Sequence, residues 1–165
     1  MEASIDQAMR SFVIFRLGSE EYGLSIDRVR GIIRYEEATP VPRAPESVMG
    51  VVNLRGNVLP VIDLCRRLGR SAFEPSPTAR IIVAEGEGGT VGLAVDEANE
   101  VSGISASTIM PAPETVLSTD TADIFEGVAE RNGALIIILD LDKAVPKSEY
   151  VRSGEDSDPE GGGDV

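Results

Sequence analysis

Short runs of apolar residues alternate with turn-forming residues along most of the chain, which is typical of a mostly β protein. Residues 12–15 and 22–26 are two such runs, and Gly18 lies in the polar segment between them. Residues 22–26 also alternate with the period of two expected of a strand. The fold is therefore predicted to begin with a hairpin.

The most distinctive stretch is residues 50–64, which has the pattern of a strand, a tight turn and a second strand. Two valines precede the turn, and the apolar residues 58–62 follow it as a run of the length expected for a buried strand. Gly56 can adopt the positive φ that a tight reversal often needs. Arg55 is the charged residue of the turn, so this hairpin is suited to present one positive charge to a partner.

Short connecting elements are predicted around these hairpins. A short helical turn is expected after residue 26, leading into a strand over residues 32–35. Three prolines in residues 39–45 predict an extended connector, and residues 63–68 are expected to form a short helix. We expect four aspartates that follow apolar runs to cap the helical segments after them: Asp27, Asp63, Asp96 and Asp140.

The second half of the chain repeats the order of the first. Residues 91–96 parallel residues 22–27, and the glycine-rich residues 85–89 are predicted to form a hairpin turn. Gly50, Gly56 and Asp63 recur in the same order as Gly127, Gly133 and Asp140. This preserved order indicates two pseudo-repeated β subdomains of about five strands each. Small antiparallel sheets of this kind usually close into barrels, which removes exposed edges.

The two halves differ at the turn itself, where Arg55 in the first half corresponds to Asn132 in the second. The scaffold therefore needs the glycine that follows but does not need the arginine. This difference favours a partner contact for Arg55, and a solvated or ion-paired arginine is the structural alternative.

Composition and charge narrow the classes of function. The chain has 165 residues and no histidine, which removes the commonest general base and the commonest metal ligand. The single cysteine, Cys65, excludes an internal disulfide and is expected to be a buried or half-buried thiol. The net charge of −13 disfavours binding to nucleic acid or to an anionic membrane surface.

The two ends of the chain differ in composition from the rest. Residues 1–11 are mostly polar and are expected to form a flexible arm, and residues 151–165 are expected to form a disordered acidic tail. The folded domain is thus expected to span residues 12–150. Because the N-terminus lacks the basic and apolar regions of a signal peptide, we expect a cytoplasmic protein.

No catalytic constellation is evident. A Ser-His-Asp triad is excluded without histidine, and no GxxxxGK[ST] phosphate loop is present. Asp63 and Asp140 could form the carboxylate pair of a small hydrolase, but helix capping is the simpler interpretation. We therefore expect no enzymatic activity, no cofactor and no metal site. A ligand-sensing β domain is a further alternative, which would require a polar-lined pocket.

Two motifs follow each other in the central hairpin, Asn53-Leu54-Arg55-Gly56 and then Pro60-Val61-Ile62-Asp63-Leu64. Through them residues 12–145 resemble the CheW family, whose members join bacterial chemoreceptors to the histidine kinase CheA. Further segments stand at family positions in the same order: residues 12–15, 21–24, 91–96 and 111–114. The resemblance implies two intertwined SH3-like five-stranded β-barrels with short helices, in a single domain.

The resemblance also implies a function and its partners. Family members are non-catalytic scaffolds that bind the regulatory domain of a CheA-type histidine kinase and the cytoplasmic tip of methyl-accepting chemoreceptors. Receptor tips dock in the groove between the barrels, and the whole assembly forms membrane-associated arrays. The positions at or near this contact correspond to Val29, Ile32, Asn53, Leu54, Arg55 and Val101.

One residue departs from the family pattern. Many relatives carry a glutamate where this chain has Gly31, which removes a charge from the implied contact surface. The pathway also stays open at this point. Chemotaxis and a chemosensory array for surface motility or development would use the same docking chemistry.

Overall fold

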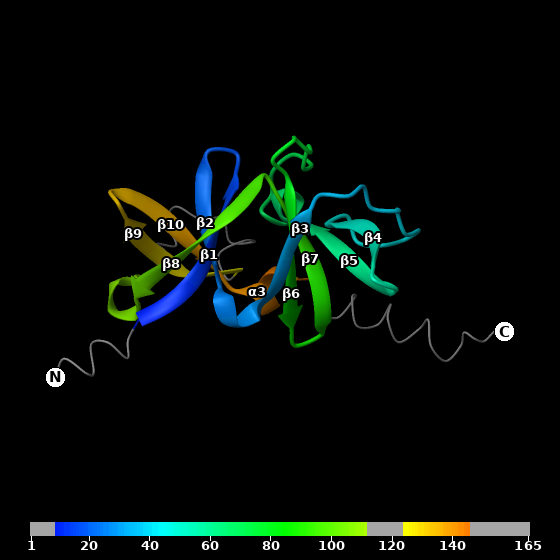
Figure 1. Cartoon of the computed structure of the whole chain (residues 1–165). Coiled ribbons are helices and arrows are strands. Elements are labelled where there is room, and N and C mark those ends of the chain that lie inside the picture. Colours follow the sequence, from blue (N-terminus) through cyan, green and yellow to red (C-terminus); the bar gives the residue numbers. More distant parts are fainter. Residues whose placement is uncertain (1–8, 112–123, 146–165) are drawn as a thin grey trace.

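Two five-stranded sheets make up the computed structural model, which describes residues 9–111 and 124–145 (Figure 1). The first sheet contains β1 (Met9–Leu17), β2 (Glu20–Ser25), β8 (Glu97–Ser105), β9 (Phe125–Arg131) and β10 (Ala134–Leu139). The second sheet contains β3 (Val29–Arg34), β4 (Val48–Leu54), β5 (Asn57–Asp63), β6 (Arg80–Gly86) and β7 (Gly89–Val95). The helical elements are short: η1 (Ile26–Arg28), α2 (Leu64–Arg67), η2 (Ala106–Thr108) and α3 (Leu141–Ala144).

The two halves of the sequence exchange strands between the sheets. The strand order is β8-β1-β2-β10-β9 in the first sheet and β3-β6-β7-β5-β4 in the second. The first sheet takes the hairpin β1-β2 from the first half of the chain and its other three strands from the second half. The second sheet takes the hairpin β6-β7 from the second half and its other three strands from the first half. In Figure 1 the blue β2 lies beside the orange β10, and the blue β3 lies beside the green β6. The predicted mostly β, intertwined fold with two five-stranded units is confirmed.

Among residues 9–111 and 124–145, one isolated bridge links the two edges of each sheet. The segment that follows β3 pairs through Thr39 with Val51 of β4, the opposite outer strand of the second sheet. In the first sheet, Met110 pairs with Val128 of β9 in the same way. The backbone N–H of Thr39 donates to the Val51 carbonyl over 2.8 Å, and the Val51 N–H donates back over 2.9 Å. Within the described residues, one residue pair in each sheet thus brings the segment after one outer strand against the other outer strand.

Two equivalent glycines allow these bridges to form. A Cβ atom on Gly50 would collide with the carbonyl oxygen of Thr39. A Cβ atom on Gly127 would lie 2.5 Å from the carbonyl oxygen of Met110. The recurrence of Gly50 as Gly127 in the sequence therefore has a physical cause, which is close backbone approach at the bridge.

Each sheet has its own apolar core, and a third core lies between the sheets. Phe12 and Ile14 of β1 face the core of the first sheet, whereas Val13 and Phe15 face the core between the sheets. Both faces of β1 are therefore buried, which explains its continuous apolar run. Members of the core between the sheets include Tyr22 and Leu24 from the first sheet and Ile62, Ile82 and Leu93 from the second.

The helix caps were predicted correctly at two of four aspartates. The Asp63 carboxylate accepts a hydrogen bond from the backbone N–H of Arg66 over 3.2 Å, and Asp140 accepts from the N–H of Lys143 over 3.4 Å. Asp27 instead lies inside η1, whose N-cap is Ser25. Asp96 accepts from the backbone N–H of Gly18 over 2.6 Å and so joins β7 to the first hairpin. The capping predictions for Asp27 and Asp96 are wrong.

Two strands begin earlier than predicted. β1 begins at Met9, so the inner end of the expected N-terminal arm is strand, because it pairs with β8 from Met9 onward. β3 begins at Val29 rather than at residue 32, because the helical turn before it ends at Arg28. The predicted tail, residues 151–165, lies outside the described residues. Among the described residues, no helix has the length and apolar character needed to cross a membrane.

The bridging glycines can be tested by substitution. Gly127→Ala and Gly50→Ala are each expected to lower the free energy of unfolding by about 2–3 kcal/mol, because the new methyl group forces the bridge apart. Gly31→Ala is the matched control, since a Cβ on Gly31 meets no atom within 4 Å. Urea denaturation measures the three variants. Equal stability of Gly127→Ala and Gly31→Ala would contradict the close approach.

Candidate partner-binding surface

The turn between β4 and β5 holds Arg55 in a left-handed conformation. Leu54 pairs with Asn57, so Arg55 and Gly56 form a two-residue loop, and their φ angles are 56° and 86°. The equivalent loop in the second half has φ angles of 55° at Asn132 and 81° at Gly133. Two positive φ angles in a two-residue hairpin loop are typical of a type I′ turn, which favours Asn-Gly.

Arg55 is poorly suited to its place in the fold. A side chain with a Cβ atom in the left-handed region costs about 1 kcal/mol, and asparagine tolerates it better. The turn is held by Asn53, whose side-chain oxygen accepts a hydrogen bond from the backbone N–H of Gly56 over 2.9 Å. Within the part of the chain that the structure describes, no acidic side chain pairs with Arg55. Arg55 is exposed to solvent. Neither the conformation of the turn nor an ion pair therefore accounts for an arginine at this position.

Val29, Ile32 and Val101 lie on the two outer strands that face the boundary between the sheets. We call these three residues the seam residues. Ile32 is opposite Ile82, and Val101 is opposite Val13, and both partners belong to the core between the sheets. Directly opposite residues share a face of the sheet, so Ile32 and Val101 extend that core toward the surface.

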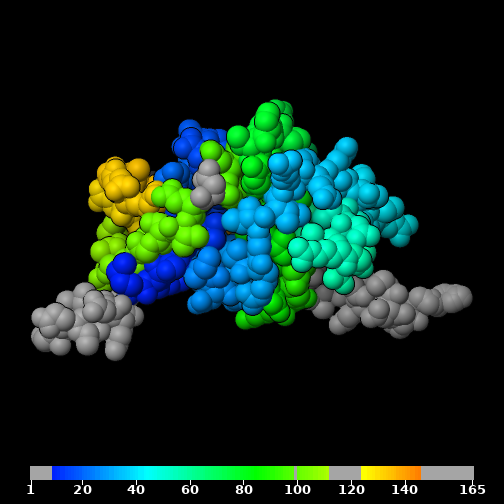
Figure 2. Space-filling model, viewed as in Figure 1, coloured from blue at the N-terminus to red at the C-terminus, as the bar shows by residue number. Residues whose placement is uncertain are grey.

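The seam residues differ in how far they reach solvent. Ile32 is 38% exposed and Val101 is 60% exposed, whereas Val29 packs against the core between the sheets. Their strands β3 and β8 both cross the front of the molecule in Figure 1, and the same face is drawn space-filling in Figure 2. Together they place an apolar surface beside the boundary between the sheets.

The six residues implied by the resemblance thus form two groups. The seam residues come from β3 and β8, and the hairpin-tip residues Asn53, Leu54 and Arg55 come from β4 and its turn. Leu54 packs against the core of the second sheet and so supports the hairpin. Asn53 and Arg55 are exposed. The sequence alone did not distinguish these roles.

Val58 is an exposed residue that the sequence pattern missed. It was predicted to lie in a buried strand run, but it is 70% exposed and stands opposite Asn53 in the hairpin. Leu135 occupies the equivalent strand of the second half and is 63% exposed. Val58 therefore adds an exposed apolar side chain opposite Asn53, near the end of the hairpin.

Gly31 of β3 faces open space. A Cβ atom there would meet nothing within 4 Å, so a larger side chain fits without moving the backbone. The glycine is therefore not required by packing at this position of β3.

The groups with possible chemical reactivity are engaged in structural contacts. The second carboxylate oxygen of Asp63 accepts a buried hydrogen bond from the backbone N–H of Phe73 over 2.9 Å, in addition to its helix cap. Burial raises the pKa of the Cys65 thiol to about 11, with a smaller contribution from Asp63 and Asp96. Residues 9–111 and 124–145 contain no group of three His, Cys, Asp or Glu side chains arranged to hold a metal ion.

Comparison with known proteins identifies a consistent set of relatives. The family model described as CheW-like domain matches residues 11–149. The chain is 39% identical over 140 residues to the chemotaxis protein CheW of Rhizobium meliloti, covering 85% of this chain and 90% of that protein. It is 36% identical over 135 residues to the chemotaxis protein CheW of Bacillus subtilis, covering 82% and 86% of the two chains.

A solved structure has the same fold. The scaffolding protein TtCheW from Thermoanaerobacter tengcongensis superposes with a TM-score of 0.76 at 36% sequence identity. The match covers 85% of this chain and 91% of that structure. The similarity therefore extends over both sheets and is not confined to one hairpin.

Replacing Arg55 by the residue found in the equivalent turn tests whether it is needed for folding. Arg55→Asn is expected to raise the free energy of unfolding by about 0.5–1 kcal/mol, because asparagine is favoured at this position of a type I′ turn. Chemical denaturation measures the change. A marked loss of stability would mean that Arg55 makes a structural contact.

The raised pKa of Cys65 predicts low reactivity. Because the thiolate is the reacting form, a thiol with a pKa of about 11 should react at pH 8 roughly 100-fold more slowly in the folded protein than after unfolding. A colorimetric disulfide reagent, with and without guanidinium chloride, measures both rates. Equal rates would show that the folded thiol has an ordinary pKa.

Proposed function

The chain belongs to the CheW-like domain family, and from this premise we propose that it couples methyl-accepting chemoreceptors to a CheA-type histidine kinase. It acts as a chemotaxis adaptor, a role that the relatives named as chemotaxis protein CheW support. The family is one of non-catalytic scaffolds, and we propose the same for this chain. Its place of work is the cytoplasm, at membrane-associated receptor arrays.

The observation that carries this proposal is the match to the family model over residues 11–149. The turn of β4 and β5 adds independent support. Arg55 occupies a conformation that disfavours it and has no acidic partner among the described residues. A contact with another protein accounts for an exposed arginine in such a turn.

We assign the seam residues to the receptor. An amphipathic helix docks by placing its apolar face on an apolar surface, and Ile32 and Val101 offer such a surface beside the boundary between the sheets. The hairpin-tip residues Asn53 and Arg55 add polar contacts, and Val58 adds an apolar one. An arginine buried by a partner can contribute roughly 2 kcal/mol or more to binding.

The mechanism is simultaneous binding by a rigid body. The core between the sheets fixes the orientation of β3 relative to β8, so a shift of one partner is passed to the other rather than absorbed. An adaptor of this kind changes kinase activity only when its contacts differ between the two receptor states.

The competing functions lack comparable support. A small hydrolase would need Asp63 free to react, yet both of its carboxylate oxygens accept hydrogen bonds from backbone N–H groups. A stand-alone ligand-sensing domain is not favoured, because the relatives share the adaptor fold and are named as chemotaxis proteins. An adaptor in an array that controls surface motility or development would use the same docking contacts, so this alternative is a variant of the proposed function.

A binding titration tests the adaptor function. Wild type is expected to bind the regulatory domain of its CheA-type kinase and a receptor-tip fragment with micromolar or tighter affinity. Arg55→Glu is expected to weaken binding to at least one of them by about 30-fold, the equivalent of roughly 2 kcal/mol. Isothermal titration calorimetry measures both partners.

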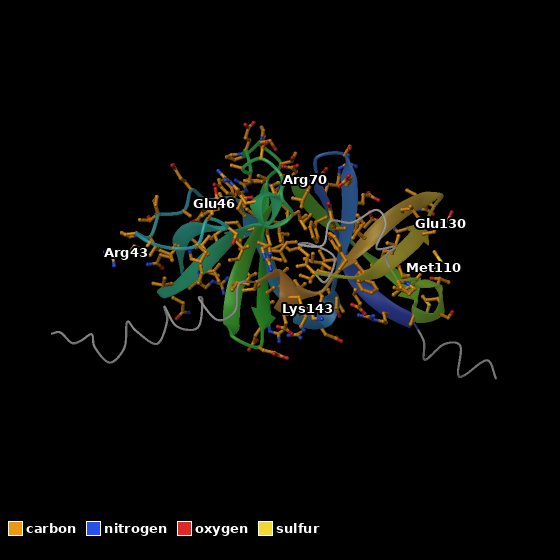
Figure 3. The ribbon with its side chains drawn as sticks, turned by 180° about the vertical axis from the view of Figure 1, so that it is seen from behind. Arg43, Glu46, Arg70, Met110, Glu130 and Lys143 are labelled. Carbon is orange, nitrogen blue, oxygen red and sulfur yellow. The ribbon has the colours of Figure 1, made fainter. Side chains whose placement is uncertain are left out.

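Arg43→Glu is the matched control for the change in charge. Arg43 is also an exposed arginine with a positive φ, of 68°. Figure 3 shows it at the outer end of the second sheet, pointing away from the first sheet. Equal weakening by Arg43→Glu would mean that only net charge matters. If wild type bound neither partner, the adaptor function would be wrong for this chain.

A further inference from the structure

Two arginines stand directly opposite each other on neighbouring strands of the second sheet. Arg34 of β3 pairs in register with Arg80 of the antiparallel strand β6. Side chains at directly opposite positions lie on the same face of the sheet, and like charges placed there repel. The fold therefore places two arginine side chains on the same face at the end of the outer strand.

Acidic side chains do not neutralise this pair within the described residues. Most exposed arginines elsewhere are ion-paired, for example Arg16 with Glu97 and Arg30 with Glu85. Arg80 donates from Nη1 to the backbone carbonyl of Ala79 over 2.8 Å. No ion pair joins Arg34 or Arg80 to a described carboxylate. Burial and, after it, the Glu37 and Asp63 carboxylates raise the pKa of the neighbouring Tyr35 hydroxyl, so acidic groups also lie near the two arginines without an ion pair to either.

The two arginines line a shallow pocket of about 460 Å³. Its lining consists of Arg34, Tyr35, Ser76, Pro77, Ala79 and Arg80. Every charged group in this lining is cationic, and the hydroxyls of Tyr35 and Ser76 can also donate hydrogen bonds. The Tyr35 ring is tilted against Phe73 with 5.5 Å between the ring centroids, which helps to hold that wall in place. The donor set suits an oxyanion.

The pocket continues the seam surface. Ile32 and Arg34 are two residues apart on β3 and so point to the same side of the strand, toward the face that Ile82 shares with the core between the sheets. A helix that covers Ile32 can therefore extend to the pocket. In an unmodified protein partner the side-chain oxyanion available to arginines is a carboxylate, often bound through two parallel N–H···O bonds.

We propose that Arg34 and Arg80 together bind a glutamate or aspartate side chain of the receptor segment that docks over Ile32. The inference rests on the proposed function, because it names the chemistry of that partner. The bound carboxylate relieves the repulsion between the two guanidinium groups, so the site is complete only in the complex.

The test measures binding of a receptor-tip fragment to the full chain and to four variants. Arg34→Gln and Arg80→Gln are each expected to weaken binding about tenfold. The double variant is expected to lose less than the product of the two single effects, since both arginines hold the same carboxylate. Arg16→Gln, which makes the same change in charge on the first sheet, is expected to alter the affinity less than twofold.

Two further measurements distinguish a binding role of Arg34 and Arg80 from a structural one. The melting temperatures of Arg34→Gln and Arg80→Gln should equal or exceed that of wild type, because the substitution removes like-charge repulsion. Changing the one receptor Glu or Asp that binds both arginines to Gln or Asn should weaken binding as much as Arg34→Gln does. With that altered fragment, Arg34→Gln should cause no further loss of affinity.

The outcomes that overturn the inference are distinct from failure of the adaptor function. Wild-type binding that neither arginine variant weakens would leave the adaptor standing and refute the carboxylate site. Fully multiplicative losses in the double variant would refute a shared carboxylate. Absence of any binding by wild type to receptor tip and kinase domain would refute the adaptor and, with it, this site.

Discussion

The apolar core between the two sheets is the contact on which the rest of the structure depends. Phe15 and Tyr22 of the first sheet stack with 5.5 Å between their ring centroids, and Ile62, Ile82 and Leu93 of the second sheet are fully buried with them in the same core. Burial of a large apolar side chain is worth about 1.5–3 kcal/mol, so this core is a major part of the stability of the fold.

Strand exchange makes this core hard to divide. Each sheet contains strands from both halves of the chain, so separating the two halves would break strand pairs in both sheets, namely β1 with β8, β2 with β10, β3 with β6 and β5 with β7. Polar contacts reinforce the join. Arg28 of η1 pairs with Asp142 of α3 at 2.5 Å, and Arg67 of α2 donates to the backbone carbonyl of Ala144 over 2.7 Å. The outer strands that carry the seam residues are therefore held in a fixed relation.

The local features of this fold could be predicted from the sequence, because they depend on neighbouring residues. The hairpin of residues 50–64, its two-residue turn and the caps at Asp63 and Asp140 all follow from short-range patterns. The repeated order of glycines also revealed the two halves. Asp96 escaped prediction because its hydrogen bond goes to Gly18, far away in the sequence.

The features that determine which residues lie at the surface depend on pairings between segments that are distant in the sequence. The exchange of strands, the bridges at Thr39 and Met110 and the opposition of Arg34 to Arg80 have no local signal. The candidate site residues came from family resemblance, and only the register of the strands shows which of them face the boundary between the sheets. For the same reason the exposure of Val58 was missed, since its apolar run resembles that of a buried strand.

The central claim is that one rigid body holds receptor and kinase at the same time. Sedimentation velocity of the full chain mixed with a receptor-tip fragment and the kinase regulatory domain tests it most directly. The account predicts a species that contains all three components and sediments faster than either two-component complex. Displacement of one partner by the other, with no three-component species at saturating concentrations, would contradict it.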